Sequence, residues 1–255
     1  MDWLEALGLV AAALFAGAVN AVAGGGSLIS FPALVAAGYP AKTANVTNTV
    51  ALWPGYLGGS LGYLEELGNQ RRRIVRLVVP SILGALAGSA ILLSTSESAF
   101  EYIVPFLILF ATGLTAFQGR LTELAERHRM SARSAEHVPV LLLGAVFLFA
   151  VYGAYFGAGL GILTFSVLSV LVPDDLQRLN ALKGILSLLI NAVAVFYFAA
   201  FGPVEWAPAA LMAVGALAGG YIGAGVARRL GQDRLRAAVV LFGAAIAVIL
   251  FVRLL

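Results

Sequence analysis

The chain has 255 residues, of which 61% are hydrophobic and only 11% are charged. Soluble domains carry about 25% charged residues, so a water-soluble fold of this size would lack the polar cover that its surface needs. The net charge of +3 does not indicate a nucleic-acid partner, because the basic residues occupy short loops between apolar spans. The sequence also contains no cysteine, which excludes disulfides and thiolate chemistry.

Apolar stretches follow one another along the chain, and two of them are too short to cross about 30 Å of hydrocarbon. In chain order the stretches are 4–23, 27–38, 44–64, 74–94, 99–118, 138–156, 160–172, 179–200, 206–227 and 237–254. The short stretches, 27–38 and 160–172, follow glycine-rich breaks at Gly24–Ser27 and Gly157–Gly161. We therefore predict two helical hairpins, 4–38 and 138–172, that turn within or near the membrane.

The charges in the loops predict how the chain is oriented. Acidic residues without basic ones occupy the loops 94–101 and 201–205, and basic residues crowd three other loops. The positive-inside rule puts the basic loops in the cytoplasm and both termini outside. The start, Met1–Glu5, is acidic rather than basic, so we do not expect a cleaved signal peptide. The basic loops hold Arg71, Arg72, Arg73, Arg76, Arg120, Arg127, Arg129, Arg133, Arg228, Arg229, Arg234 and Arg236.

The two halves of the chain match in element order and in short runs of sequence. Gly84–Gly88 recurs as Gly215–Gly219, and Ser30-Phe31 recurs as Thr164-Phe165. The predicted fold is an all-α polytopic membrane protein with two inverted repeats, each a glycine-broken re-entrant hairpin plus three transmembrane helices. The first repeat spans 1–118, the second spans 138–255, and a cytoplasmic loop at 119–137 joins them.

Inverted repeats are a hallmark of secondary transporters, and glycine-interrupted segments at matching places indicate the substrate site. The Gly-x-x-x-Gly patterns themselves indicate helix packing within one chain, and they also suit a homodimer.

Polar residues at membrane depth gather at the two breaks and at the start of the span after each hairpin. Helix starts expose N–H groups that favour negative charge, so these residues predict a site for a small anion. Lys183 would supply the positive charge there, although a lysine at this depth can also snorkel to the cytoplasmic surface. The predicted substrate-binding residues are Asn20, Ser27, Asn45, Thr47, Asn48, Gly161, Asn180, Lys183 and Asn191.

The acidic residues all lie at the termini or in loops, which excludes a carboxylate proton relay and disfavours a cationic substrate. Both histidines, His128 and His137, fall in the 119–137 loop. We therefore expect no catalytic group, no metal site and no cofactor, which disfavours a membrane-embedded enzyme. Two further functions compete with a carrier: an anion channel, which would need a continuous pore, and a structural or assembly subunit.

The run Asn20–Leu34, followed by Gly38-x-Pro40 and Ala44–Asn48, resembles the TauE/SafE family, often called sulfite exporters. The second-half run Gly153–Gly161, followed by Asn180, Lys183 and Asn191, is similar to the same family. The resemblance implies a multi-pass carrier in the bacterial inner membrane for a small sulfur-containing anion such as sulfite, sulfoacetate or another organosulfonate, with export as the expected direction. Another small oxyanion or a carboxylate is the alternative substrate.

Overall fold

A computed structural model describes residues 2–22, 24–61, 67–129, 140–172, 174–230 and 232–254. These residues form ten α-helices and one short 3-10 helix, with no strand among them. In chain order the elements are α1 (Trp3–Val22), α2 (Ser27–Ala36), α3 (Ala41–Leu61), η1 (Gly68–Gln70), α5 (Arg71–Ser94), α6 (Glu97–Arg129), α7 (Val140–Tyr155), α8 (Leu160–Leu171), α9 (Leu176–Phe201), α10 (Trp206–Leu230) and α11 (Gln232–Leu254).

The helix that we expected over 99–118 is longer in the structure. It continues to Arg129, so residues 119–129 of the expected loop are helical. Apolar composition marks where hydrocarbon ends, whereas the backbone bonds of a helix can continue into water. The remaining expected loop residues, 130–137, lie outside the described residues.

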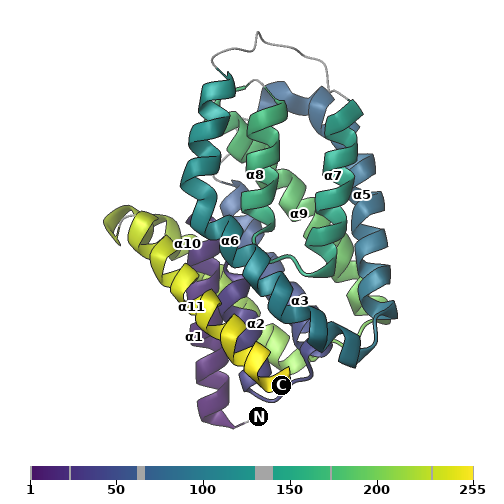
Figure 1. The fold of residues 1–255 in the computed structure, drawn as a ribbon, viewed down its shortest axis with the longest axis vertical. Helices are drawn as coiled ribbons and strands as arrows, with labels where there is room; N and C mark the ends of the chain where they lie inside the picture. The colour runs from purple at the N-terminus through teal and green to yellow at the C-terminus, as the bar shows by residue number, and fades with distance from the viewer. Residues whose placement is uncertain are drawn as a thin grey trace.

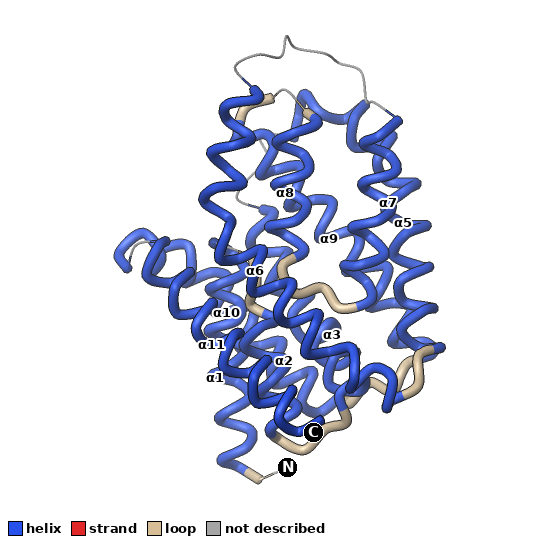
Figure 2. The backbone as a smooth tube through the Cα atoms, in the orientation of Figure 1, coloured by secondary structure: helices blue, strands red, loops and turns tan. Residues whose placement is uncertain are grey.

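Figures 1 and 2 show that the two hairpins occupy opposite ends of the molecule. The α7–α8 pair lies in the upper half of the view and the α1–α2 pair in the lower half, near both termini. Helices α1 and α2 contact each other, as do α7 and α8. Helix α3 contacts the first hairpin and α9 contacts the second, and α3 and α9 also contact each other, so together they form the centre of the bundle.

The most extensive helix contacts are those of α1 with α10 and of α5 with α7. Small residues let the backbones of these helices approach each other closely. A Cβ atom added at Gly215 would lie 2.6 Å from the carbonyl oxygen of Val10, and one at Gly219 would fall on that of Leu14. Gly84 and Gly88 meet α7 in the same way. Close backbone approach at glycine is the usual means of helix association in lipid, where the hydrophobic effect does not drive it.

Large apolar side chains cover the outer surface of the bundle. Among the described residues, four helical segments are long and apolar enough to cross a membrane: Trp3–Asn20, Arg71–Ser94, Glu97–Arg120 and Gln177–Phe201. Exposed rings and aliphatic chains on several helices would be unfavourable in water but are normal against lipid. Examples are Phe15, Val79, Leu148, Phe196 and Tyr221. The protein is therefore a helical membrane protein.

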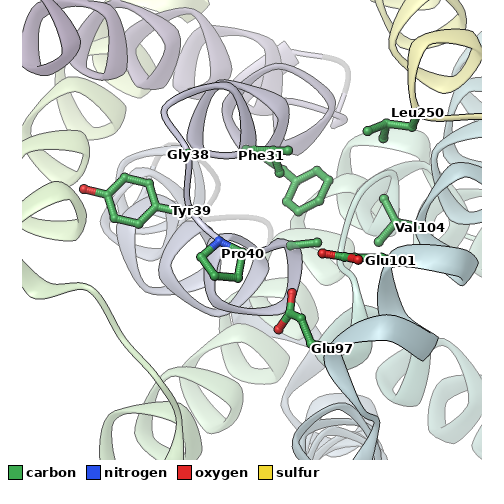
Figure 3. A pocket seen from close by; sticks show the side chains of 10 residues that line it. Phe31, Gly38, Tyr39, Pro40, Glu97, Glu101, Val104 and Leu250 are labelled. Atoms are coloured by element: carbon green, nitrogen blue, oxygen red, sulfur yellow. The ribbon is translucent and has the colours of Figure 1, made fainter. Parts of the chain in front are cut away.

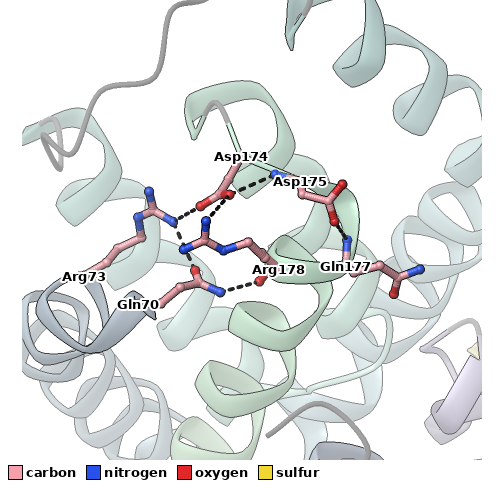
Figure 4. Close-up of polar contacts among 6 residues, drawn as sticks. All are labelled: Gln70, Arg73, Asp174, Asp175, Gln177 and Arg178. Carbon is pink, nitrogen blue, oxygen red and sulfur yellow. Dashed lines mark hydrogen bonds and ion pairs between the residues drawn. The ribbon is translucent and has the colours of Figure 1, made fainter. Parts of the chain in front are cut away.

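A network of ion pairs and hydrogen bonds joins the two halves at the upper end of the molecule (Figure 4). The Arg73 guanidinium lies 2.6 Å from one Asp174 carboxylate oxygen, and that of Arg178 lies 3.3 Å from the other. The Gln70 amide donates to the Arg178 carbonyl and accepts from Arg73. The Arg73 and Asp174 side chains are only 15% and 10% exposed, so this pair is better shielded than an ordinary surface ion pair.

The α1–α10 contact generates a prediction about stability. Gly219→Ala places a methyl group on the Leu14 carbonyl, so we expect a loss of about 1–3 kcal/mol and a lower melting temperature in detergent. Gly144→Ala on α7 is the matched control, because nothing lies within 4 Å of its Cβ position. Equal melting temperatures for the two variants would contradict this description of the contact.

Candidate functional site

The first break is held by a side chain that precedes it. Helix α1 ends at Val22, and Gly24 has a φ of +69°, which only glycine adopts readily. The Gly24 N–H donates to the carbonyl of Val19 at 3.1 Å. The Asn20 side-chain oxygen accepts the N–H groups of Gly25 and Gly26, at 3.0 and 2.8 Å. Asn20 thus satisfies donors that the interrupted helix would otherwise leave bare.

The second break has the same backbone turn but lacks this side-chain cap. Gly157 N–H donates to the carbonyl of Tyr152 at 3.3 Å, and Gly159 has a φ of +75°. Gly153 stands four residues before Gly157, as Asn20 stands four before Gly24, and it has no side chain to offer. Within the described residues, no side chain accepts from the N–H groups at the start of α8. The Leu160 N–H donates to the carbonyl of Gly157 at 3.1 Å, so among the described residues the N–H groups of Gly161 and Ile162 are the donors that this helix start keeps available.

The two breaks contact each other. A Cβ atom added at Gly24 would lie 3.3 Å from the Cα atom of Gly161, so the two turns pack with backbone against backbone. A Cβ atom on Gly161 would lie 3.9 Å from Cδ of Lys183, so the lysine stem passes beside the start of α8. In the part of the chain that the structure describes, the Lys183 ammonium makes no ion pair or hydrogen bond. A positive charge without a partner therefore accompanies the uncapped helix start.

Three of the expected site residues lie together on the first part of α3. The Asn45 amide donates to the carbonyl of Tyr155 at 2.9 Å, so it binds the last turn of α7 beside the second break. Asn48 is one turn further on, and the structure gives its buried side-chain oxygen no hydrogen-bond partner among the described residues. Thr47 is different, because its hydroxyl accepts the N–H of Glu205 at 3.0 Å and ties α3 to the α9–α10 connection.

The other expected residues are spread along α2 and α9. Ser27 is buried at the first residue of α2, directly after the first break. Asn180 is half-buried one turn before Lys183 on α9. Asn191 is two turns beyond Lys183, and its amide donates to the Ser187 carbonyl at 2.8 Å. The close group is therefore Gly24, Gly161 and Lys183, with Asn45 beside the second break.

Two buried hydroxyls near this group, which we did not include among the predicted binding residues, are also without partners. The structure gives Thr164 Oγ1 and Ser187 Oγ no hydrogen bond within the described residues, and both side chains are buried. The sequence shows them only as polar residues at membrane depth. Their unbonded state depends on local geometry, which no sequence pattern reports.

A pocket of about 530 Å³ opens at the lower end of the molecule, near the termini (Figure 3). It is lined by Phe31, Glu97, Glu101 and Leu250 among others, so its charge is negative rather than positive. Burial, then the carboxylates of Glu5 and Glu205, raise the pKa of the Tyr39 phenol above its ordinary value, so Tyr39 stays neutral and adds no charge to the pocket.

Phe31 separates this pocket from the second break. Its ring packs edge-on against Phe156, with 5.6 Å between the ring centroids, and Phe156 directly precedes Gly157. Phe31 is only 1% exposed although it lines the pocket. One ring of this aromatic pair therefore lines the pocket, and the other adjoins the second break.

The role of Asn20 as a cap can be tested by stability. Asn20→Ala leaves two buried N–H donors without an acceptor, so we expect a loss of about 1–3 kcal/mol and a lower melting temperature. Asn20→Asp keeps an acceptor oxygen beside the start of α2 and should retain most of the stability. Equal melting temperatures of Asn20→Ala and the parent would exclude the capping role.

Comparison with known proteins assigns the chain to a family. A sequence model described as "Sulfite exporter TauE/SafE" matches residues 9–250. A "Probable membrane transporter protein" of Haemophilus influenzae is 27% identical over 223 residues, covering 88% of this chain and 85% of that protein. "Probable membrane transporter protein YfcA" of Escherichia coli K12 is 25% identical over 240 residues, covering 91% and 84%. No solved structure matches the chain. Because the family match covers nearly the whole sequence, the chain belongs to the sulfite exporter TauE/SafE family.

Proposed function

We propose that this protein is a secondary transporter that moves a small sulfur-containing anion, such as sulfite, sulfoacetate or another organosulfonate, out across the inner membrane by alternating access. Its relatives are named as membrane transporters, and the family description names sulfite export. The observation that carries the proposal is the contact of Gly24 with Gly161 beside Lys183, whose ammonium has no partner among the described residues.

The proposed site uses the start of α8 as its anion-binding element. N–H groups at a helix start, together with the positive end of the helix dipole, favour negative charge. The Lys183 stem lies beside Gly161, so its ammonium can add a full charge to these partial ones. The remaining proposed contacts are Asn20, Ser27, Asn45, Thr47, Asn48, Asn180 and Asn191, among which Asn20 and Thr47 already bond to backbone groups. No cofactor or metal is part of this proposal.

Two inverted repeats, 1–118 and 138–255, are proposed to build the carrier around this site. The helix contacts support this arrangement. If each helix of one half is replaced by its counterpart in the other half, the contact α1–α10 becomes α7–α5, and the contact α3–α10 becomes α9–α5. The contacts α3–α9 and α6–α11 each relate to themselves under the same exchange. In folds of this kind, the substrate site lies between the repeats, and access alternates as packed groups of helices shift. A homodimer in the bilayer is also part of the proposal.

An anion channel, or a carrier for another small oxyanion or a carboxylate, is the alternative. The close packing of Gly24 on Gly161 and of Phe31 on Phe156 favours a carrier, since a channel needs a continuous pore. A carrier gives saturable flux that anion on the far side stimulates, whereas a channel gives conductance.

The role of Lys183 can be tested by anion binding. Ligands that bind the folded state raise its melting temperature, so thermal titration with sulfite, sulfoacetate, thiosulfate, taurine and acetate selects the test anion. Lys183→Ala should weaken binding of that anion by about 10- to 100-fold, because a charged hydrogen-bond donor is lost. Lys183→Arg keeps the charge and should retain part of the affinity.

Lys42→Ala is the matched control for this experiment. It removes the other lysine of the chain, whose ammonium donates to the carbonyl of Thr95 at 2.8 Å. We expect it to leave anion affinity unchanged. Unchanged affinity and flux in Lys183→Ala would remove Lys183 from the site, and stabilisation by neutral solutes alone would contradict an anion carrier.

The proposed orientation can be tested with cysteine, because the parent chain contains none. Arg72 is exposed at the start of α5. Ser98 is exposed at the start of α6, just beyond the far end of α5. In intact cells, a membrane-impermeant maleimide should label Ser98→Cys, whereas Arg72→Cys should react only after permeabilisation. The opposite labelling pattern would show that the protein has the inverse orientation. The parent protein, which has no cysteine, gives the background level of labelling.

A further inference from the structure

Two classes can be distinguished among the buried and half-buried serine and threonine hydroxyls of the described helices. Those of the first class donate to the carbonyl four residues earlier on their own helix, as is common in helices. Ser81 does so to Leu77 at 2.7 Å, and Ser166 does so to Ile162 at 2.8 Å. Those of the second class have no hydrogen-bond partner within the described residues, and they are Ser89, Thr112, Thr164, Ser169 and Ser187.

Two members of the second class flank the group formed by Gly161 and Lys183. Thr164 is three residues after Gly161 on α8, and Ser187 is four residues after Lys183 on α9. Residues three or four apart lie on the same face of a helix. The face of α8 at Gly161 meets the side chain of Lys183, so both hydroxyls belong to the faces that α8 and α9 turn toward each other.

Burial makes their unbonded state significant. Thr164 is 0% exposed and Ser187 is 2% exposed, so protein rather than bulk solvent surrounds both. A buried polar group without a partner is unfavourable, and such groups in native proteins call for a specific explanation. The nearest charged group along α9 is Lys183, which is positive, so a partner that joins this group should be an anion that accepts hydrogen bonds.

We propose that Thr164 and Ser187 are substrate-binding residues, whose hydroxyls donate hydrogen bonds to oxygens of the anion held at Gly161 and Lys183. The inference rests on the proposed function and extends it to donors on both sides of the α8–α9 contact. An anion with several acceptor oxygens on one centre, such as a sulfite or sulfonate group, can accept from both hydroxyls and from the helix start at once. A carboxylate has one oxygen fewer to share among these donors.

The test compares affinity with stability in the full-length purified protein. Thr164→Val and Ser187→Ala should each weaken binding of the anion selected above by about tenfold. Without ligand, their melting temperatures should stay the same or rise, because removing an unpaired buried hydroxyl removes an unfavourable group. A hydroxyl with a purely structural role would give the opposite pattern, a lower melting temperature with unchanged affinity.

Ser166→Ala is the matched control, since Ser166 lies on the same helix and its hydroxyl is already bonded to Ile162. It should leave anion affinity unchanged, and Thr164→Ser, which keeps the hydroxyl, should bind the anion more tightly than Thr164→Val. If both hydroxyl variants bind the anion like the parent while Lys183→Ala does not, this inference fails and the proposed function stands. If no anion stabilises the parent protein, both fail.

Discussion

Where α1 and α7 stop inside the protein, backbone N–H and C=O groups lose their helical partners. In a membrane protein these groups need partners from the protein itself, because hydrocarbon offers none. At the first break the Asn20 side chain takes two of the donors, and at the second the Asn45 amide takes the carbonyl of Tyr155. The start of α8 differs, because no described side chain accepts a hydrogen bond from its backbone N–H groups, which lie beside Lys183. The position of the candidate site follows from this difference.

The sequence predicts well where the helices break, because glycine and span length depend on local chemistry alone. Two apolar runs are too short to cross a membrane, and the structure ends α1 and begins α8 beside the same glycines. The end of α6 was missed because charged residues after Phe117 signal water, and a helix can extend into water. Membership of the TauE/SafE family was also predicted from the glycine-rich runs and is confirmed by the match over residues 9–250.

The roles of single polar residues were harder to predict. Asn20 and Thr47 look alike in sequence as polar groups at depth, yet one caps a break and the other binds the N–H of Glu205. Both roles depend on partners that are brought near only by the turn or by another helix. Thr164 and Ser166 show that even neighbouring hydroxyls cannot be told apart from the sequence. They are two residues apart on one helix, and of this pair only Ser166 bonds to its own backbone.

The pairing of α1 with α10 and of α5 with α7 has a mechanical consequence. Each hairpin packs against a helix from the other half of the sequence, through close backbone contacts at glycine. In the proposed alternating access, the first hairpin would therefore move with α10 and the second with α5. The groups of helices that would move together are then not the two halves of the sequence. Severing the connection between α6 and α7 would give two fragments, each holding a hairpin without the helix against which that hairpin packs.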